Sequence, residues 1–161
     1  MDQLVRILLW FSAIGCGMMA GLYFAFSAFI MTALSRILQA GGIAAMQSIN
    51  AVILKSWFMP LFYGTTLAAL ALVVLAALDW SKLGAPAMAI GGAVYVLGMF
   101  GCTLALNVPL NLALDAVAPA SAEAAPVWAR YLKDWTLWNH VRTLASAASA
   151  ALFIAAIVAR A

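Results

Sequence analysis

The residues of this chain that are best able to do chemistry lie close together, between positions 135 and 143. Thr136, Asn139, His140 and Thr143 follow i, i+3, i+4, i+7 spacing, which places them on one face of a helix. His140 is the only histidine, and a neutral imidazole can remove a proton from a bound substrate near neutral pH. The same side chain could equally donate a buried hydrogen bond that fixes the helix register, and the sequence leaves both roles open.

Arg142 lies beside this face and also has two interpretations. Its guanidinium could stabilise an anion in a pocket, or it could extend to the lipid headgroups and pair with Asp134 or Asp115. In the preceding apolar segment, Asn107 and Asn111 are four residues apart and therefore share a helix face. These amides could face the histidine segment across a pocket, or they could cap a kink at the proline between them.

These side chains must be positioned by helices that cross a membrane. Of the 161 residues, 68% are hydrophobic and 8% charged, whereas a soluble domain is about half apolar and about a quarter charged. The apolar runs predict an all-α bundle of four transmembrane helices in a single domain over residues 1–161. An interfacial amphipathic helix is expected over 43–55, between the first two spans. We expect the spans at about 7–34, 57–78, 86–108 and 135–158.

Alternation of the four spans brings most of the unusual side chains to one membrane face. Polar groups inside a bilayer are costly, and they usually face a bundle interior, a partner or a wet cavity. Nothing comparable gathers at the other face, so the sequence predicts a pocket in one half of the membrane. The residues at this face are Arg36, Asn50, Lys55, Asn107, Asn111, Trp135, Asn139, His140 and Arg142.

Several other kinds of site are disfavoured. The 8 Lys and Arg residues form no basic run that could follow a nucleic acid. One histidine, two separated thiols and no membrane-embedded acid are too few ligands for a metal ion, although a single histidine could ligate a haem. Cys16 and Cys102 are expected on opposite sides of the bilayer midplane, which predicts two free, buried thiols. There is no dinucleotide fingerprint and no P-loop.

The sequence says less about processing, oligomerisation and membrane orientation. The first apolar run continues far beyond the length of a signal peptide, so we expect an uncleaved first span, with the bacterial inner membrane as its location. Gly17 and Gly21 form a GxxxG motif that favours close helix packing, and with Gly91 and Gly98 they would also allow a homo-oligomer. The cations divide almost evenly between the two sides of the membrane, so they say little about the orientation of the chain. One side has Arg6, Lys82 and Arg160, and the other has Arg36, Lys55, Arg130 and Lys133.

Four patches of sequence carry a family resemblance: AGLYFAFS at 20–27, AMQSIN at 45–50, NVPLN at 107–111 and WTLWNHVRT at 135–143. Together they resemble the anthrone oxygenase-like family of small four-helix membrane proteins, over most of the chain. The resemblance implies oxidation of a lipophilic aromatic substrate (an anthrone, or a related phenol or quinol) by dioxygen without a cofactor. It implies a site formed by His140 and Asn139 with Arg142 and Asn111. Our own hypothesis for the roles is His140 as the general base, with Asn139 and Arg142 as further catalytic residues. The residues that we expect to contact the substrate are Asn107, Asn111, Trp135, Trp138, Asn50 and Tyr23.

Two other functions stay open from the sequence. The chain could be a non-enzymatic protein that binds a lipid or quinone, or one that stabilises a partner membrane complex. A transporter or channel is disfavoured, because the other half of the bundle offers no continuous polar path. In every case membrane lipids are partners, and for an oxygenase the small aromatic substrate and dioxygen are added.

Overall fold

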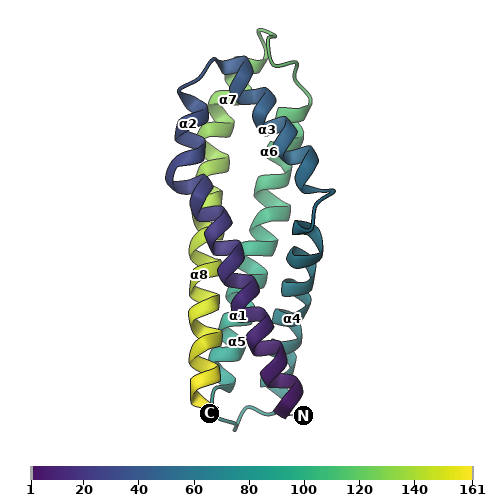
Figure 1. The fold of residues 1–161 in the computed structure, drawn as a ribbon, viewed down its shortest axis with the longest axis vertical. Coiled ribbons are helices and arrows are strands. Elements are labelled where there is room, and N and C mark those ends of the chain that lie inside the picture. Colours follow the sequence, from purple (N-terminus) through teal and green to yellow (C-terminus); the bar gives the residue numbers. More distant parts are fainter. Residues whose placement is uncertain (1, 161) are drawn as a thin grey trace.

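A computed structural model describes residues 2–160, and all the regular structure in this range is helical. Four long helical spans run along the axis of an elongated bundle, with both chain ends at its lower end (Figure 1). Spans 1 to 4 are Asp2–Ser35, Phe58–Leu78, Ala85–Asp115 and Ala124–Ala159, and each is long and apolar enough to cross a membrane. The predicted all-α architecture with four membrane spans is confirmed.

Wide π-helical turns interrupt three of the four spans. Such turns are rare and occur frequently at functional sites. Here they lie in the spans that carry most of the polar side chains described below. Span 1 consists of α1 (Asp2–Ala25), η1 (Phe26–Ile30) and α2 (Met31–Ser35); span 2 is α4 (Phe58–Leu78); span 3 consists of α5 (Ala85–Val94), η2 (Tyr95–Gly101), η3 (Thr103–Asn107) and α6 (Val108–Asp115); span 4 consists of α7 (Ala124–Arg130), η4 (Tyr131–Trp135) and α8 (Thr136–Ala159).

Spans 3 and 4 are longer helices than their apolar segments predict. Span 3 continues through Pro109 to Asp115, and span 4 already begins at Ala124. A proline cannot donate a backbone hydrogen bond to the preceding turn, and a local π-helical adjustment can accommodate that loss. The π-helical turn η3 ends two residues before Pro109, so the chain stays helical there.

The predicted interfacial helix is α3 (Gln39–Ile53). It does not lie flat across the end of the bundle but runs obliquely along its upper side, beside α6 (Figure 1). Ile43 and Met46 are fully buried, and the Gln47 Nε2 donates to the backbone carbonyl of Leu114 over 2.9 Å. The helix therefore forms part of the wall of the upper bundle.

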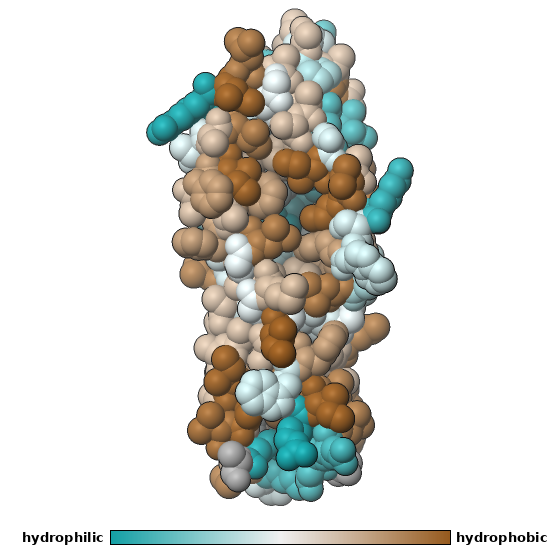
Figure 2. All heavy atoms as spheres, in the orientation of Figure 1, coloured by the Kyte–Doolittle hydropathy of each residue, from teal (hydrophilic) through white to brown (hydrophobic). Residues whose placement is uncertain are grey.

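The outer surface identifies the chain as an integral membrane protein. Large apolar side chains are exposed along the whole bundle, among them Ile14, Leu67 and Leu97 (Figure 2). α4 has 21 residues, and at about 1.5 Å per residue it matches the hydrocarbon core of about 30 Å. Trp57 and Trp80 lie just beyond its two ends and are both exposed, as expected for side chains at the two membrane interfaces.

Two apolar cores stabilise the bundle, one above the other. The lower core joins the four spans between the chain ends and the middle of the bundle, and the upper core joins α3 to the upper parts of spans 1, 3 and 4. Cys16 belongs to the lower core, and both it and Cys102 are free and buried, which confirms the prediction of two unpaired thiols. Between the cores lies a layer of polar side chains.

The tight helix contacts are not made by the GxxxG motif. A Cβ atom at Gly17 or Gly21 would meet nothing within 4 Å, because both glycines face outward. At Gly92, in contrast, a Cβ atom would lie 2.7 Å from the backbone oxygen of Ala69. Span 3 therefore lies in close contact with the backbone of span 2 at Gly92, and the expected close packing at Gly17 and Gly21 finds no partner within the described chain.

We predict that Gly92→Ala destabilises the protein by about 1–3 kcal/mol. The new methyl group has no free volume, and the Ala69 backbone that it would meet cannot move aside as a flexible side chain could. The matched control is Gly17→Ala, which should be neutral or stabilising by up to about 1 kcal/mol through helix propensity. Unfolding of both variants in detergent, followed by circular dichroism, measures the difference. Equal stability of the two variants would contradict the close approach at Gly92.

Candidate functional site

A cavity of about 160 Å³ lies in the upper half of the bundle. All four spans and α3 contribute to its walls, which are mainly apolar and aromatic. A cavity of about 150 Å³ can hold a benzene molecule, so this one accommodates one aromatic ring, and a larger flat ligand requires side chains at its opening to move. The lining residues are Leu22, Tyr23, Phe26, Met46, Ile49, Asn50, Ile53, Leu54, Phe58, Met59, Phe62, Tyr63, Thr103, Leu104, Val108, Asn111, Trp135 and Arg142.

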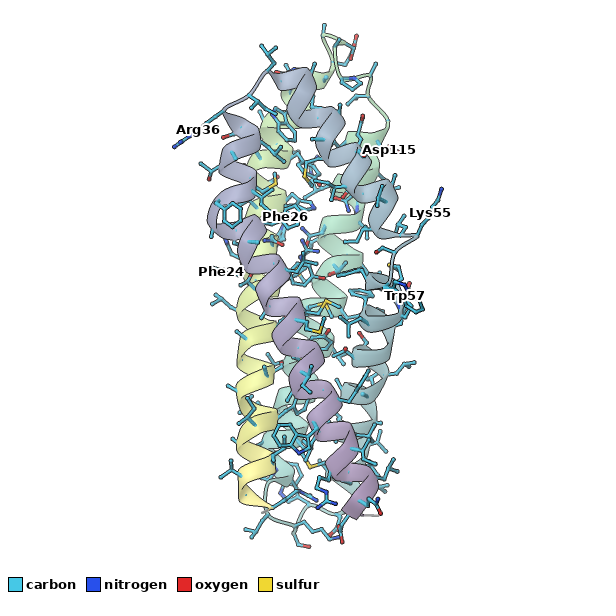
Figure 3. All side chains as sticks on the ribbon, in the orientation of Figure 1. Phe24, Phe26, Arg36, Lys55, Trp57 and Asp115 are labelled. Carbon is cyan, nitrogen blue, oxygen red and sulfur yellow. The ribbon has the colours of Figure 1, made fainter. Side chains whose placement is uncertain are left out.

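The cavity opens to the side of the bundle rather than to its end. Its lining residues on α1 and η1 face those on α3 and α4, and Figure 2 shows a hollow in the upper half whose floor is hydrophilic and whose border is apolar. Near this opening the labelled Lys55 and Trp57 point outward from the α3–α4 connection (Figure 3). Leu54 and Tyr63 are both exposed at the rim. A lipophilic molecule dissolved in the bilayer can therefore enter sideways.

Of residues 2–160, Arg142 alone places a cation in the cavity wall, and it is buried, with 5% of its surface exposed. Its guanidinium carbon lies 4.3 Å from the ring centroid of Tyr23 and 4.9 Å from that of Trp135. Tyr23 belongs to the lower core and Trp135 to the upper core. The guanidinium is thus held between two aromatic rings at the level where the two cores meet, an arrangement that stabilises a cation by its attraction to the ring faces.

Asn139 orients this guanidinium. Its Oδ1 accepts a hydrogen bond of 2.8 Å from the Arg142 Nη2. Its Nδ2 donates to the backbone carbonyl of Tyr23 and to the Ser27 Oγ, each over 2.7 Å. Ser27 Oγ also lies 3.2 Å from the Thr143 Oγ1. Asn139 is fully buried and both its amide N–H groups are used, so it ties span 4 to span 1 and sets the position of Arg142.

No carboxylate neutralises Arg142 within residues 2–160. The salt bridges in this range join Lys82 to Asp2 and to Asp79, and Arg130 to Asp134. The predicted alternative that Arg142 pairs with Asp134 is therefore not found, and neither is a pair with Asp115. The Arg142 Nε is buried and has no hydrogen-bond partner. A buried, unpaired guanidinium is costly in a low-dielectric environment, and it favours the entry of an anion.

A second polar group forms the upper wall of the cavity. The Tyr131 hydroxyl donates to the Asn111 Oδ1 over 2.9 Å and accepts from the Asn50 Nδ2 over 3.4 Å. The ring of Tyr131 is stacked between two others, with centroid distances of 5.8 Å to Trp128 and 5.5 Å to Trp135. Of the three rings in this stack, Trp135 lines the cavity, and Trp128 and Tyr131 are buried behind it.

Asn107 lies behind the cavity wall rather than in it. It is fully buried, and its Nδ2 donates to the backbone carbonyl of Trp135 over 3.2 Å. Its Oδ1 lies 3.8 Å from the Cys102 Sγ, which can donate to it. The Trp135 Nε1 is buried without a partner. Asn107 thus holds span 3 against span 4 directly behind a tryptophan that lines the cavity.

The structure brings together most, but not all, of the residues predicted for the site. Arg142, Asn111, Trp135, Asn50 and Tyr23 line the cavity, with Asn139 and Asn107 bonded directly behind it. Trp138 is half-buried and packs against the upper core.

His140 is exposed and does not line the cavity. It follows Asn139, and neighbouring residues on a helix point about 100° apart, so burial of Asn139 turns His140 outward. The expectation that it faces the pocket is not met.

Sequence reasoning missed several residues of the site. Tyr131 has a signal in the sequence, because Trp128, Tyr131 and Trp135 follow the i, i+3, i+7 spacing of one helix face. Thr103 and Phe62 line the cavity but have no distinguishing neighbours in the sequence. Within the described residues no group of three His, Cys, Asp or Glu side chains lies together that could hold a metal ion.

Comparison with known protein families gave a match. A family model described as anthrone oxygenase matches residues 53–152 of this chain. The matched segment contains spans 2 and 3 and most of span 4, and with them Arg142, Asn139, Asn111 and Trp135. Neither the curated proteins nor the solved structures gave a match.

Proposed function

Because this chain belongs to the anthrone oxygenase family, we propose that it is an oxygenase that oxidises a lipophilic aromatic substrate with dioxygen inside the membrane. The substrate class is an anthrone or a related phenol or quinol. The observation that carries the proposal is the buried Arg142 guanidinium, which has no carboxylate partner among residues 2–160 and lines an aromatic cavity open to the bilayer. An aromatic molecule with one ionisable oxygen would supply an anion for Arg142 and a flat ring for the aromatic cavity.

In the proposed reaction, Arg142 stabilises the anionic form of the substrate. Loss of a proton from the methylene carbon of an anthrone leaves an electron pair that spreads over the ring system to the oxygen. That oxyanion would lie beside the guanidinium, where the surrounding low dielectric strengthens the attraction. Tyr23 and Trp135 flank the guanidinium and would lie against the substrate rings.

Dioxygen then reacts with the electron-rich carbon. A carbon–oxygen bond forms, dioxygen is reduced to the level of a peroxide, and a proton completes the hydroperoxide. Loss of the remaining hydrogen on that carbon together with the outer hydroxyl group of the hydroperoxide releases one water and leaves the quinone carbonyl. One dioxygen is consumed for each water formed, and the substrate itself supplies the electrons.

Among the described residues, the cavity lining holds neither a carboxylate nor a histidine, so in this proposal the first proton passes to water at the cavity opening. His140, predicted as the general base from the sequence, is exposed on the other side of α8 from the cavity. From this position we predict that His140→Gln keeps activity within about threefold of the wild type, since a general base contributes about 10²- to 10⁴-fold when it acts directly. The measurement is oxygen uptake by purified protein with an anthrone-type substrate. A loss of 100-fold or more would restore His140 as the base.

A non-enzymatic role is the second candidate. The cavity is small, apolar and open to lipid, and these features suit the binding of a quinone head group as well as a reaction. Tight binding of a quinone with no oxygen uptake above a protein-free detergent blank would favour this role and would reject the oxygenase for the substrates tested.

A further inference from the structure

A second cavity lies at the opposite end of the bundle, where both chain ends are found. Its volume is about 890 Å³, within the range of about 300–1,000 Å³ that is typical of small-molecule sites. The start of α1, the connection between α4 and α5, and the end of α8 form its walls. Figure 2 shows a hydrophilic patch at this lower end with apolar residues on both sides.

Charges in this lower cavity are only partly neutralised. The Lys82 Nζ lies 2.8 Å from the Asp2 Oδ1 and 3.1 Å from the Asp79 Oδ2. The carboxylates of Asp2 and Asp79 hold the pKa of Lys82 above its usual value, so it remains a cation. Arg6 and Arg160 also line the cavity, and neither forms an ion pair within residues 2–160. The Arg160 Nε is buried and has no hydrogen-bond partner. Among the described residues, two guanidinium groups in this cavity therefore make no contact ion pair.

The same cavity changes from charged to apolar along the bundle axis. Arg6 is followed on α1 by Leu9 and Trp10, and Arg160 is preceded on α8 by Ile157. Trp10 is half-exposed, as is typical of a tryptophan at a membrane interface. The charged part thus lies at the level of the lipid headgroups, and the apolar part lies at the level of the acyl chains.

We propose that this lower cavity binds an anionic phospholipid, with its phosphate between Arg6 and Arg160 and an acyl chain along α1 and α8. A guanidinium can donate two parallel hydrogen bonds to phosphate oxygens. The apolar wall next to the two arginines favours a lipid over a soluble phosphate, because it would bury hydrocarbon as well as charge. The site is separate from the upper cavity, so the proposal does not depend on the oxygenase reaction.

The test is a titration of delipidated protein in detergent with phosphatidylglycerol, phosphatidylcholine or inorganic phosphate, with bound lipid counted by native mass spectrometry. We expect phosphatidylglycerol to bind in preference to phosphatidylcholine, and inorganic phosphate not to compete at millimolar concentration. Arg6→Gln and Arg160→Gln should each weaken phosphatidylglycerol binding about fivefold, which corresponds to about 1 kcal/mol for each basic residue near an anionic membrane surface. Arg36→Gln, an exposed arginine at the other end, should leave binding unchanged.

Three outcomes would overturn the proposal. They are equal binding of the two lipids, wild-type affinity in the Arg6→Gln, Arg160→Gln double variant, or displacement of the lipid by inorganic phosphate. If the double glutamine variant fails to fold, the double lysine variant takes its place. It keeps both charges but loses the paired hydrogen bonds, and should bind phosphatidylglycerol more weakly than the wild type.

Discussion

Arg142→Met is expected to abolish substrate-dependent oxygen uptake while leaving the protein at least as stable as the wild type. Loss of one group that stabilises a developing oxyanion lowers turnover by about 10²- to 10³-fold. Stability should not fall in parallel, because the guanidinium is buried and has no carboxylate partner in the described part of the chain, and replacement of a buried charge by an apolar side chain is often neutral or stabilising. Oxygen uptake and unfolding in detergent measure the two effects on the same preparation.

Two further variants make this prediction specific. Arg142→Lys keeps the charge but loses the planar group between Tyr23 and Trp135, so its activity should lie between that of the methionine variant and the wild type. Arg36→Gln removes an exposed arginine near the same end of the bundle and should retain full activity. A methionine variant that is both inactive and strongly destabilised would instead assign Arg142 a structural role.

The second large effect is expected from Asn139→Leu, which should lower both stability and activity. The change removes the hydrogen bonds of 2.7 Å to the Tyr23 carbonyl and the Ser27 Oγ, and that of 2.8 Å from the Arg142 Nη2. Three buried hydrogen bonds within a membrane bundle correspond to about 2–3 kcal/mol of unfolding free energy. Arg142 would lose the group that orients it, so turnover should fall by about tenfold or more.

Asn50→Leu provides the matched comparison for stability. This asparagine makes a single hydrogen bond of 3.4 Å to the Tyr131 hydroxyl and is only half-buried, so its replacement should change the unfolding free energy by less than about 1 kcal/mol. Kinetics separate the two roles of Asn139: a positioning residue should lower turnover more than substrate affinity. If the Asn139 and Asn50 variants are equally stable, the proposed link between spans 1 and 4 is wrong.

Both effects arise from the layer in which the two cores meet. Arg142 contacts a ring from each core, and Asn139 connects it to the backbone of span 1. The site therefore depends on the register of span 4 against span 1. A change in that register would move the cation relative to the aromatic walls, even with every cavity residue present.

The sequence by itself determined the class of the protein and the end of the bundle at which the site lies. Apolar runs of membrane-spanning length need only composition and helix geometry, so four spans could be predicted without tertiary contacts. The gathering of asparagines, arginine and tryptophans at one face followed from alternation of the spans. For the same reason Asn111, Trp135 and Arg142 could be named before the cavity was known.

The face of α8 that turns inward was decided only by the tertiary structure. Asn139 and His140 are sequence neighbours and both polar, so spacing alone cannot say which one points into the bundle. The buried line is Trp135, Asn139, Arg142, Ser146 and Ser149, and the two serines are the signal in the sequence that could have indicated it. α8 packs closely against α1, and the hydrogen bonds of Asn139 to Tyr23 and Ser27 fix which face of α8 turns inward. His140 is outside for that reason, and Arg142 rather than His140 lines the cavity.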